Sequence, residues 1–439
     1  MKKKYNQKNG QLLWKKAKKI IPGGNMLLSK RSEMFAPDQW NPYFKKSNKY
    51  NVWTLDGKKF IDMFFGVGTN TLGYCNTNID NAVKKSINNG TMSSLNCPEE
   101  VFLAEKLLEI NPWASMVKFA RTGGEANAIA IRIARAASGK DNIAICGYHG
   151  WHDWYLAANL SEQNALSNHL LPGLRPSGVP KKLLDTTFPF NFNDINALKK
   201  LIKTKNIGVI KMEVYRNYPP KDNFLKKVRK LATDNNIVLI FDECTSGFRQ
   251  TYGGLFNIYN VIPDVVLFSK ALGNGYAISA LVGKKEIMEN AQNSFISSTF
   301  WTERIGYVAA LATLKEMKRQ KSWIKITKVG NYIYKGWKKI AKDNFLDINF
   351  YGIPALKSFS FNSKNHLAYK TYLSQEMQKK GIIASNLFYA STVHDKKIIN
   401  KYFDELNKIF KVIKDCEEGR DIKKLLKGPI CHNNFKRLN

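Results

Sequence analysis

The stretch D-V-V-L-F-S-K-A-L-G-N, residues 264–274, decides the fold and contains the first candidate for chemistry. Its apolar run, residues 265–268, is bounded by turn-forming residues and is typical of a strand buried on both faces of a parallel sheet. Lys270 follows the carboxyl end of that strand, where open α/β sheets bind their ligands. An amine there can form an imine with a carbonyl group, although a surface lysine in a Lys-rich chain needs no such role.

Helices and strands alternate on both sides of this stretch. Strands are expected at residues 116–120, 142–147, 207–214, 237–242 and 264–269, with helices at 98–110, 125–138, 194–204 and 222–235. This alternation predicts an α/β fold with a mostly parallel sheet covered by helices.

The two ends of the chain have a different pattern. Long helical stretches follow residue 303, with short strand-like runs at 356–361 and 382–384, and Asp56-Gly57 between apolar runs predicts an early β-hairpin. We therefore expect a large domain over residues 66–302. A smaller α+β domain is expected from residues 303–439, joined by the N-terminal segment 1–65.

The chain of 439 residues carries a formal net charge of +34, which raises nucleic acid as a partner. The lysines are scattered through every segment, however, and on residues 224–235 they follow the polar face of an amphipathic helix. A solvated basic surface is therefore predicted, with no nucleic-acid partner. A basic nucleic-acid-binding protein remains the alternative, and it requires a clustered basic face.

Membrane, secretory and metal-binding classes are not supported by the sequence. No apolar run reaches the roughly 18–20 residues that cross a bilayer, and the basic Lys2, Lys3 and Lys4 precede no apolar signal-peptide core. The six cysteines form no C-x-x-C pair, so neither a disulfide framework nor a structural metal site is indicated. A cytoplasmic protein without a metal or membrane partner is expected.

The stretch R-T-G-G-E-A, residues 121–126, lies between an expected strand and an expected helix. Glycines that open a helix present free backbone N–H groups near the positive end of the helix dipole, which suits a phosphate. The motif lacks the lysine and serine of a P-loop and the spacing of a dinucleotide fingerprint. It predicts either a phosphate site or an ordinary strand–helix turn.

A second polar position ends the very apolar run I-V-L-I-F-D-E, residues 237–243. Asp242 at a strand end needs a cation or hydrogen-bond donors to offset its desolvation. The protonated ring nitrogen of a pyridoxal cofactor is one such partner; a salt bridge or Mg²⁺ is the alternative.

The aromatic stretch G-Y-H-G-W-H-D-W, residues 147–154, follows another strand. His149 and His152 could suggest a metal, but no third ligand has a familiar spacing. A face for ring stacking agrees better with so many aromatic residues. Together, a phosphate turn, an aromatic face, a buried acid and a strand-end lysine are what a pyridoxal-phosphate site requires.

These motifs resemble those of the class III aminotransferases of fold type I. The resemblance includes P-G-G at 22–24, D-G-x-x-F-I-D at 56–62, T-G-G-E-A, G-Y-H-G, D-E-x-x-x-G-F-R at 242–249 and S-K-A-L-G-N-G at 269–275. It covers most of the chain and is strongest toward glutamate-1-semialdehyde 2,1-aminomutase and its amino-sugar and polysaccharide relatives. It implies a seven-stranded-type sheet in the large domain and pyridoxal 5′-phosphate as cofactor.

The resemblance also implies roles for individual residues. Lys270 would hold the cofactor as an aldimine and move the proton, and Asp242 would pair with the ring nitrogen. The remaining cofactor-binding positions would be Thr122, Gly123, Gly124, Tyr148, His149, Glu213 and Thr299. Thr299 would reach the phosphate in the neighbouring subunit, which implies a homodimer.

The sequence departs from the mutase pattern around the substrate. Ser29 and Arg31 are displaced equivalents of its carboxylate-binding residues, Val67 replaces a tryptophan between glycines, and Asn386 replaces a gating acid. Arg31, Arg249 and Arg304 all remain candidates for holding a substrate carboxylate.

These observations favour an aminotransferase that moves an amine from a small-molecule donor to a small carbonyl or keto-sugar acceptor through Lys270. The alternative is a true glutamate-1-semialdehyde aminomutase that makes 5-aminolevulinate. A catalytically inactive paralogue is disfavoured because the lysine, the acid and the phosphate turn are all present.

Overall fold

The computed structural model describes residues 8–215, 217–435 and 438. The basic residues Lys2, Lys3 and Lys4 of the expected N-terminal segment lie outside the described residues. The chain forms two compact units. The large unit is Thr77–Ile324, and the small unit combines Met1–Asn76 with Lys325–Asn439. The domain boundaries expected after residues 65 and 302 stay a prediction.

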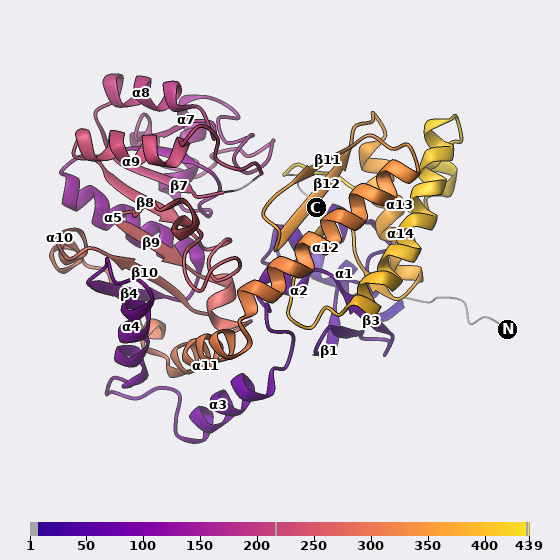
Figure 1. The fold of residues 1–439 in the computed structure, drawn as a ribbon, viewed down its shortest axis with the longest axis horizontal. Coiled ribbons are helices and arrows are strands. Elements are labelled where there is room, and N and C mark those ends of the chain that lie inside the picture. The colour runs from indigo at the N-terminus through magenta and orange to yellow at the C-terminus, as the bar shows by residue number, and fades with distance from the viewer. Residues whose placement is uncertain (1–7, 216, 436–437, 439) are drawn as a thin grey trace. The chain divides into compact units, whose positions relative to one another are not determined.

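The large unit is built on a seven-stranded sheet with the order β4-β10-β9-β8-β7-β5-β6 (Figure 1). Neighbouring strands from β9 to β6 are parallel, whereas β10 is antiparallel to both β9 and β4. The expected α/β fold with a mostly parallel sheet is thus confirmed. The strands are β4 (Met116–Ala120), β5 (Asn142–Cys146), β6 (Thr187–Pro189), β7 (Ile207–Glu213), β8 (Val238–Asp242), β9 (Val265–Phe268) and β10 (Ser279–Gly283).

Some helices of the large unit lie between these strands in the chain, as the alternating pattern predicts, and others precede the first strand or follow the last. They are α3 (Thr77–Asn88), α4 (Glu99–Ile110), α5 (Gly123–Ser138), α6 (Asp153–Leu156), α7 (Ala158–Ser161), α8 (Ile195–Thr204), α9 (Phe224–Asp234), α10 (Lys285–Met288) and α11 (Arg304–Gln320). Helix α5 packs across the sheet and reaches five of its strands (Figure 1).

Helix α5 and the strands beneath it share one hydrophobic core. Its buried alanines and isoleucines form one core cluster with Ile145 of β5, Val209 of β7 and Ile240 of β8. Every residue of β7, β8, β9 and β10 is buried. These strands are therefore rigid supports for whatever follows their carboxyl ends.

The small unit contains two small sheets and long helices. The hairpin expected around Asp56-Gly57 joins β2 to β3, and Gly57 has the positive φ of 75° that such a turn requires. One sheet has the order β1-β2-β3-β13 and the other β11-β12-β14. The strands are β1 (Phe44–Asn48), β2 (Asn51–Thr54), β3 (Lys59–Asp62), β11 (Ile348–Tyr351), β12 (Leu356–Phe361), β13 (Ile382–Ile383) and β14 (Leu387–Tyr389).

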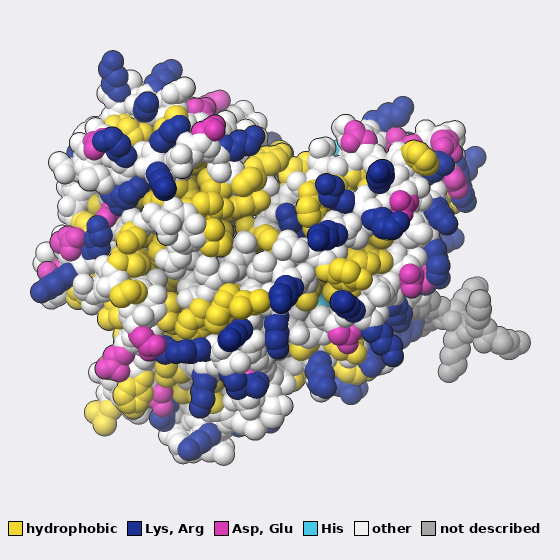
Figure 2. Space-filling view, in the orientation of Figure 1, with side chains coloured by type: hydrophobic (Ala, Val, Ile, Leu, Met, Phe, Trp, Pro, Cys, Tyr) yellow, Lys and Arg dark blue, Asp and Glu magenta, His cyan; other side chains and the backbone are white. Residues whose placement is uncertain are grey.

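Four longer helices and one short, kinked helix complete the small unit. They are α1 (Lys8–Ile20), α2 (Phe65–Gly68), α12 (Ser322–Asp343, whose first turn belongs to the large unit), α13 (His366–Lys379) and α14 (Lys396–Glu417). In the described ranges no helix combines the length and the apolar character that crossing a bilayer requires. Figure 2 shows lysine and arginine side chains dispersed over the visible surface rather than gathered into one patch.

Candidate active site

Polar side chains gather where neighbouring strands of the large sheet end. Strands β7 and β8 end in Glu213 and Asp242, which lie opposite each other in the parallel register. Lys270 follows β9, whose Leu267 pairs with Asp242. Because parallel strands end at the same edge of a sheet, the predicted residues are brought together at one place.

Asp242 and His149 form a buried pair. Nδ1 of His149 lies 2.8 Å from Oδ2 of Asp242, and the two side chains are 0% and 3% exposed. The other carboxylate oxygen accepts a hydrogen bond of 3.0 Å from the backbone N–H of Cys244. His149 thus contacts the acid that was predicted to bind the cofactor.

The electrostatics of this pair favour an ionised Asp242 and a neutral His149. Burial alone would raise the pKa of Asp242, but the hydrogen bond from His149 and the charge of Lys211 hold it well below its ordinary value. Burial lowers the pKa of His149 despite the attraction of Asp242. A neutral imidazole can then donate its Nδ1 proton to the carboxylate.

Lys270 begins a short 3₁₀ turn, Lys270–Gly273, directly after the buried strand β9. Its Nζ donates a hydrogen bond of 2.8 Å to Oγ1 of Thr245. Burial lowers the pKa of Lys270, and the nearby guanidinium of Arg249 lowers it further. A lysine with a depressed pKa has a larger share of the nucleophilic neutral amine near neutral pH.

The predicted phosphate turn opens helix α5. Thr122 is the N-cap: its hydroxyl accepts from the backbone N–H of Glu125, and the Glu125 carboxylate accepts from the backbone N–H of Thr122 at 2.8 Å. Because the Thr122 hydroxyl is occupied by this capping box, the first-turn N–H groups of Gly123 and Gly124 are the better anion donors. A side chain at Gly124 would approach the ring of His152 to 3.1 Å.

Tyr148 is held by its backbone next to Glu213. The Tyr148 N–H donates to Oε2 of Glu213 at 3.0 Å, while the Tyr148 side chain is 37% exposed. A Cβ on Gly147, where φ is 118°, would lie 2.5 Å from the same oxygen. Only glycine therefore allows the chain to turn this closely against Glu213.

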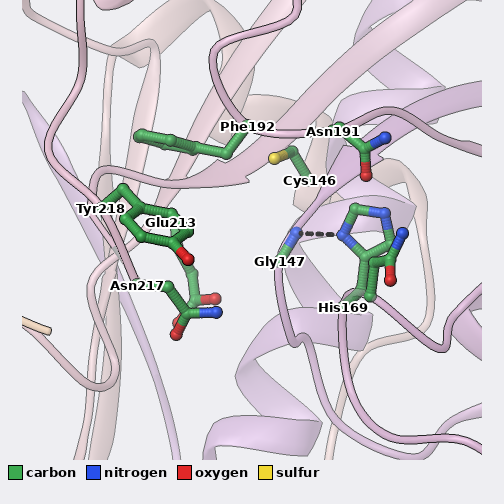
Figure 3. Close-up of a pocket in the computed structure, with 9 residues that line it drawn as sticks. Cys146, Gly147, His169, Asn191, Phe192, Glu213, Asn217 and Tyr218 are labelled. Carbon is green, nitrogen blue, oxygen red and sulfur yellow. Dashed lines mark hydrogen bonds between the residues drawn. The ribbon is translucent and has the colours of Figure 1, made fainter. Parts of the chain in front are cut away.

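A cavity lies beside this turn, and Glu213 and Gly147 form part of its wall (Figure 3). His169 closes one side by accepting the Gly147 N–H at Nδ1, at 3.1 Å. Figure 3 shows Phe192, Asn217 and Tyr218 on the side of Glu213. Aromatic side chains and amides therefore line this cavity together with Glu213, the residue that ends β7.

Thr299 lies in the short 3₁₀ helix Thr299–Thr302 and is exposed. Arg121 ties this segment to the phosphate turn, because its Nε donates to the Phe300 carbonyl at 2.7 Å and its Nη2 to the Trp301 carbonyl at 3.1 Å. The Trp301 indole in turn donates to the Glu125 carboxylate at 3.2 Å.

The predicted substrate residues all belong to the small unit. Ser29 is exposed, and the guanidinium of Arg31 packs against Gly23. Val67 has φ of 61°, a conformation that is strained for a β-branched residue. The amide of Asn386 donates to the Phe359 carbonyl at 2.8 Å. Their role toward a substrate stays a prediction.

Two further arginines were candidates for a substrate carboxylate. Arg304 already forms an ion pair with Glu99, with 2.6 Å between Nη2 and Oε1. Arg249 is fully buried and donates from Nε to the Thr245 carbonyl.

Two residues at this edge were not predicted from the sequence. Thr245, the partner of Lys270, occupies an unspecified position of the D-E-x-x-x-G-F-R motif, so the motif does not point to it. Lys211 is fully buried in β7, and its only sequence signal is one charged residue inside the apolar run I-G-V-I-K-M-E. Both positions depend on contacts between segments that are distant in the chain.

The two histidines that raised a metal site are engaged differently. His149 pairs with Asp242, and His152 stacks on Trp151 with 4.4 Å between ring centroids. Within the described ranges, no group of three or more acidic, histidine or cysteine side chains is arranged to hold a metal ion.

Comparison with known proteins shows the family of the chain. The family model described as Aminotransferase class-III matches residues 35–396. A 3-aminobutyryl-CoA aminotransferase from Cloacimonas acidaminovorans is 32% identical over 90% of this chain and 92% of the relative. A glutamate-1-semialdehyde 2,1-aminomutase from Ignicoccus hospitalis is 30% identical over 91% of this chain and 98% of the relative.

Solved structures share the fold. The internal aldimine form of the Sphingopyxis sp. MTA144 FumI protein superposes with a TM-score of 0.84 at 20% identity, over 95% of this chain and 99% of that one. An omega-transaminase from Sphaerobacter thermophilus gives a TM-score of 0.80 at 22% identity, over 92% and 97%. The chain belongs to the class III aminotransferases, whose cofactor is pyridoxal 5′-phosphate.

Proposed function

We propose that this protein transfers an amine between a small-molecule donor and a carbonyl acceptor, with Lys270 as the reactive amine. The observation that carries the proposal is the meeting of Lys270, the Asp242–His149 pair and the first turn of α5 in one unit, at one edge of one sheet. Each of these groups suits a different part of a pyridoxal-phosphate molecule.

The residues present fit the cofactor. Asp242 is a buried ionised carboxylate that suits a protonated ring nitrogen, because an opposite charge offsets the cost of its desolvation. The N–H groups of Gly123 and Gly124 begin a helix of 16 residues, which suits a dianionic phosphate. The ring of Tyr148, a residue that is 37% exposed, is of the kind that stacks on an aromatic cofactor.

The bound cofactor supplies an electron sink that stabilises negative charge at the substrate carbon. In the proposed mechanism Lys270 would hold the cofactor through Nζ. Once the incoming amine has replaced it there, Nζ would take the proton from the substrate carbon and deliver it to the cofactor's C4′ carbon, as general base and then general acid. Thr245 holds the Lys270 Nζ through the 2.8 Å hydrogen bond and limits where the amine can move. His149 keeps Asp242 ionised and fixed in orientation.

The proposed acceptor is a small carbonyl compound or a keto-sugar. Curated relatives include both an intermolecular aminotransferase and aminomutases, which leaves glutamate-1-semialdehyde 2,1-aminomutase as the second candidate. Incubation with the semialdehyde and no amino donor separates the two. Formation of 5-aminolevulinate would favour the mutase, whereas no product from a cofactor-loaded enzyme would exclude it.

We also propose that the protein is a cytoplasmic homodimer in which Thr299 reaches the phosphate site of the second subunit. The proposal is supported by the exposure of Thr299 and of the adjacent Phe300, which is 70% exposed. The six cysteines, all free thiols, agree with a reducing compartment. Light scattering of the purified protein tests the dimer. A Thr299→Ala variant that keeps the dimer but binds the cofactor more weakly would support the phosphate contact.

The function as a whole is tested with Lys270→Ala and with Lys118→Ala, a matched control on edge strand β4. The wild type and the control should show a visible cofactor band that borohydride shifts, and amine transfer from a panel of amino donors. Lys270→Ala should lack the covalent band and lose activity on the order of a thousandfold or more. Absence of any bound chromophore in the wild type after adding pyridoxal phosphate would overturn the proposal.

A further inference from the structure

Lys211 is a buried lysine that the proposed chemistry does not use. It is 0% exposed in the middle of strand β7, and its Nζ makes no hydrogen bond within the part of the chain that the structure describes. A charged group rarely occupies such a position without a task, because burial of an unpaired ammonium is costly.

The strand register shows which way Lys211 faces. It lies opposite Ile145 of β5 and Ile240 of β8, and both isoleucines belong to the core cluster beneath α5. Residues opposite each other in neighbouring strands point to the same face of a sheet, and so do residues two apart in one strand. Lys211, Glu213 and Asp242 therefore share one face, with Lys211 one step below the two acids.

The charged and titratable groups around Lys211 come from several segments. Asp242 ends β8 and Cys244 lies in the turn after it, Glu213 ends β7, the strand of Lys211 itself, and His149 lies in the turn after β5. Burial lowers the pKa of Lys211, while Asp242 is the strongest of the groups that favour its charged form. The charge of Lys211 acts in turn on both members of the Asp242–His149 pair.

We propose that Lys211 is a positioning residue whose buried ammonium acts through its charge on the Asp242 carboxylate, which faces the ring nitrogen of the cofactor. From one step below in the sheet, and without a direct hydrogen bond, it reduces the negative charge that Asp242 presents to the ring. The proposal rests on the proposed cofactor role of Asp242. It explains why a lysine stands among apolar residues on this face. After Lys270 has reacted, the charges of the ring nitrogen and of Lys211 still offset those of the buried acids Asp242 and Glu213.

The test uses the holoenzyme of Lys211→Met and Lys211→Gln, with Lys118→Met as the matched control. Loss of the ammonium leaves the negative charge of Asp242 less compensated, so the protonated, positively charged form of the bound cofactor should persist to higher pH. We expect the midpoint of the visible-band pH titration to rise by roughly one unit in both Lys211 variants and to stay unchanged in the control. A role in packing alone would change stability and leave this midpoint in place.

Each outcome is decisive. An unchanged midpoint in a folded Lys211 variant that shows the band would overturn the proposal. Absence of the band in the wild type as well would instead overturn the proposed function. If neither variant folds, a neutron structure of the wild-type holoenzyme answers the question directly. Three deuterium atoms on the Lys211 Nζ are expected, and two would contradict the proposal.

Discussion

The imidazole Nδ1 of His149 lies 2.8 Å from Oδ2 of Asp242, and neither side chain is accessible to solvent beyond a few per cent. Because burial lowers the pKa of His149 and the contacts of Asp242 lower its own, the pair is a neutral donor on a charged acceptor. Such a hydrogen bond is stronger than one between neutral groups. It sets the orientation of the carboxylate before any ligand arrives.

Removing this hydrogen bond should weaken the enzyme without unfolding it. A hydrogen bond to a charged group contributes about 1.5–3 kcal/mol, so His149→Phe should lower kcat/KM about ten- to hundredfold. His149→Asn retains a donor near the Nδ1 position and should keep more of the activity. Steady-state kinetics and cofactor affinity check this, and equal losses in both variants would contradict the proposed role.

Stability should depend on pH through Glu243. Burial raises the pKa of Glu243 to about 7, although Ser246 Oγ at 2.7 Å and the Phe256 N–H at 2.9 Å both donate to the carboxylate. The folded protein therefore binds a proton that the unfolded chain releases near pH 4.5. The stability that this proton contributes is fully present below pH 4.5 and is lost as the pH rises through about 7.

The size of this change in stability follows from the shift of the Glu243 pKa. We expect the free energy of unfolding of the wild type to fall by about 3 kcal/mol between pH 4.5 and 8, relative to Glu243→Gln. Glutamine keeps an acceptor for Phe256 and a donor for Ser246. Denaturant titrations at both pH values measure the difference, and parallel curves for the two proteins would refute the assignment.

Gly147→Ala should disrupt the turn that carries Tyr148. The backbone there has φ of 118°, and the added methyl group would lie 2.5 Å from Oε2 of Glu213. We expect a loss of about 1–3 kcal/mol in stability together with weaker cofactor binding. Gly139→Ala is the control, since its φ of 63° is also positive but nothing lies within 4 Å of the added group. Similar cofactor affinity in both variants would argue against a special role for the turn.

Arg121→Lys should loosen the segment that contains Thr299. Lysine cannot reproduce the forked contacts to the carbonyls of Phe300 and Trp301. We expect faster proteolytic cleavage within residues 298–303 and lower cofactor affinity. Arg132→Lys is a suitable comparison, because Arg132 donates to the Phe295 carbonyl at 3.0 Å outside this segment. Cleavage at the same rate in both variants would show that Arg121 does not hold the segment.

The fold was largely predictable because its central strands are short apolar runs followed by polar residues. Strands β8 and β9 and helix α5 lie within a residue or two of their expected positions. Strand β10 was missed, since its five residues S-A-L-V-G show no period and end in glycine. Its antiparallel place between β4 and β9 is a property of the whole sheet that no local pattern encodes.

In the candidate site, too, some residues could be predicted from the sequence and others could not. Lys270 and Asp242 were predictable because each is a polar residue directly after a buried strand. The contact of Lys270 with Thr245 and the place of Lys211 below Asp242 were not, because both depend on side chains that meet across segments. His149 was expected from its motif, but its partner became evident only from the structure.

The small unit is assembled from both ends of the chain: β13, near the C-terminal end, pairs in parallel with β3, near the N-terminal end. During synthesis, the ribosome completes the whole large unit before it makes the second half of the small one. One edge of β3 therefore stays unpaired until residues 382–383 have been synthesised. We expect the large unit to fold first and the pairing of β3 with β13 to be a late step. Until then, the unpaired edge of β3 is the segment most prone to aggregation.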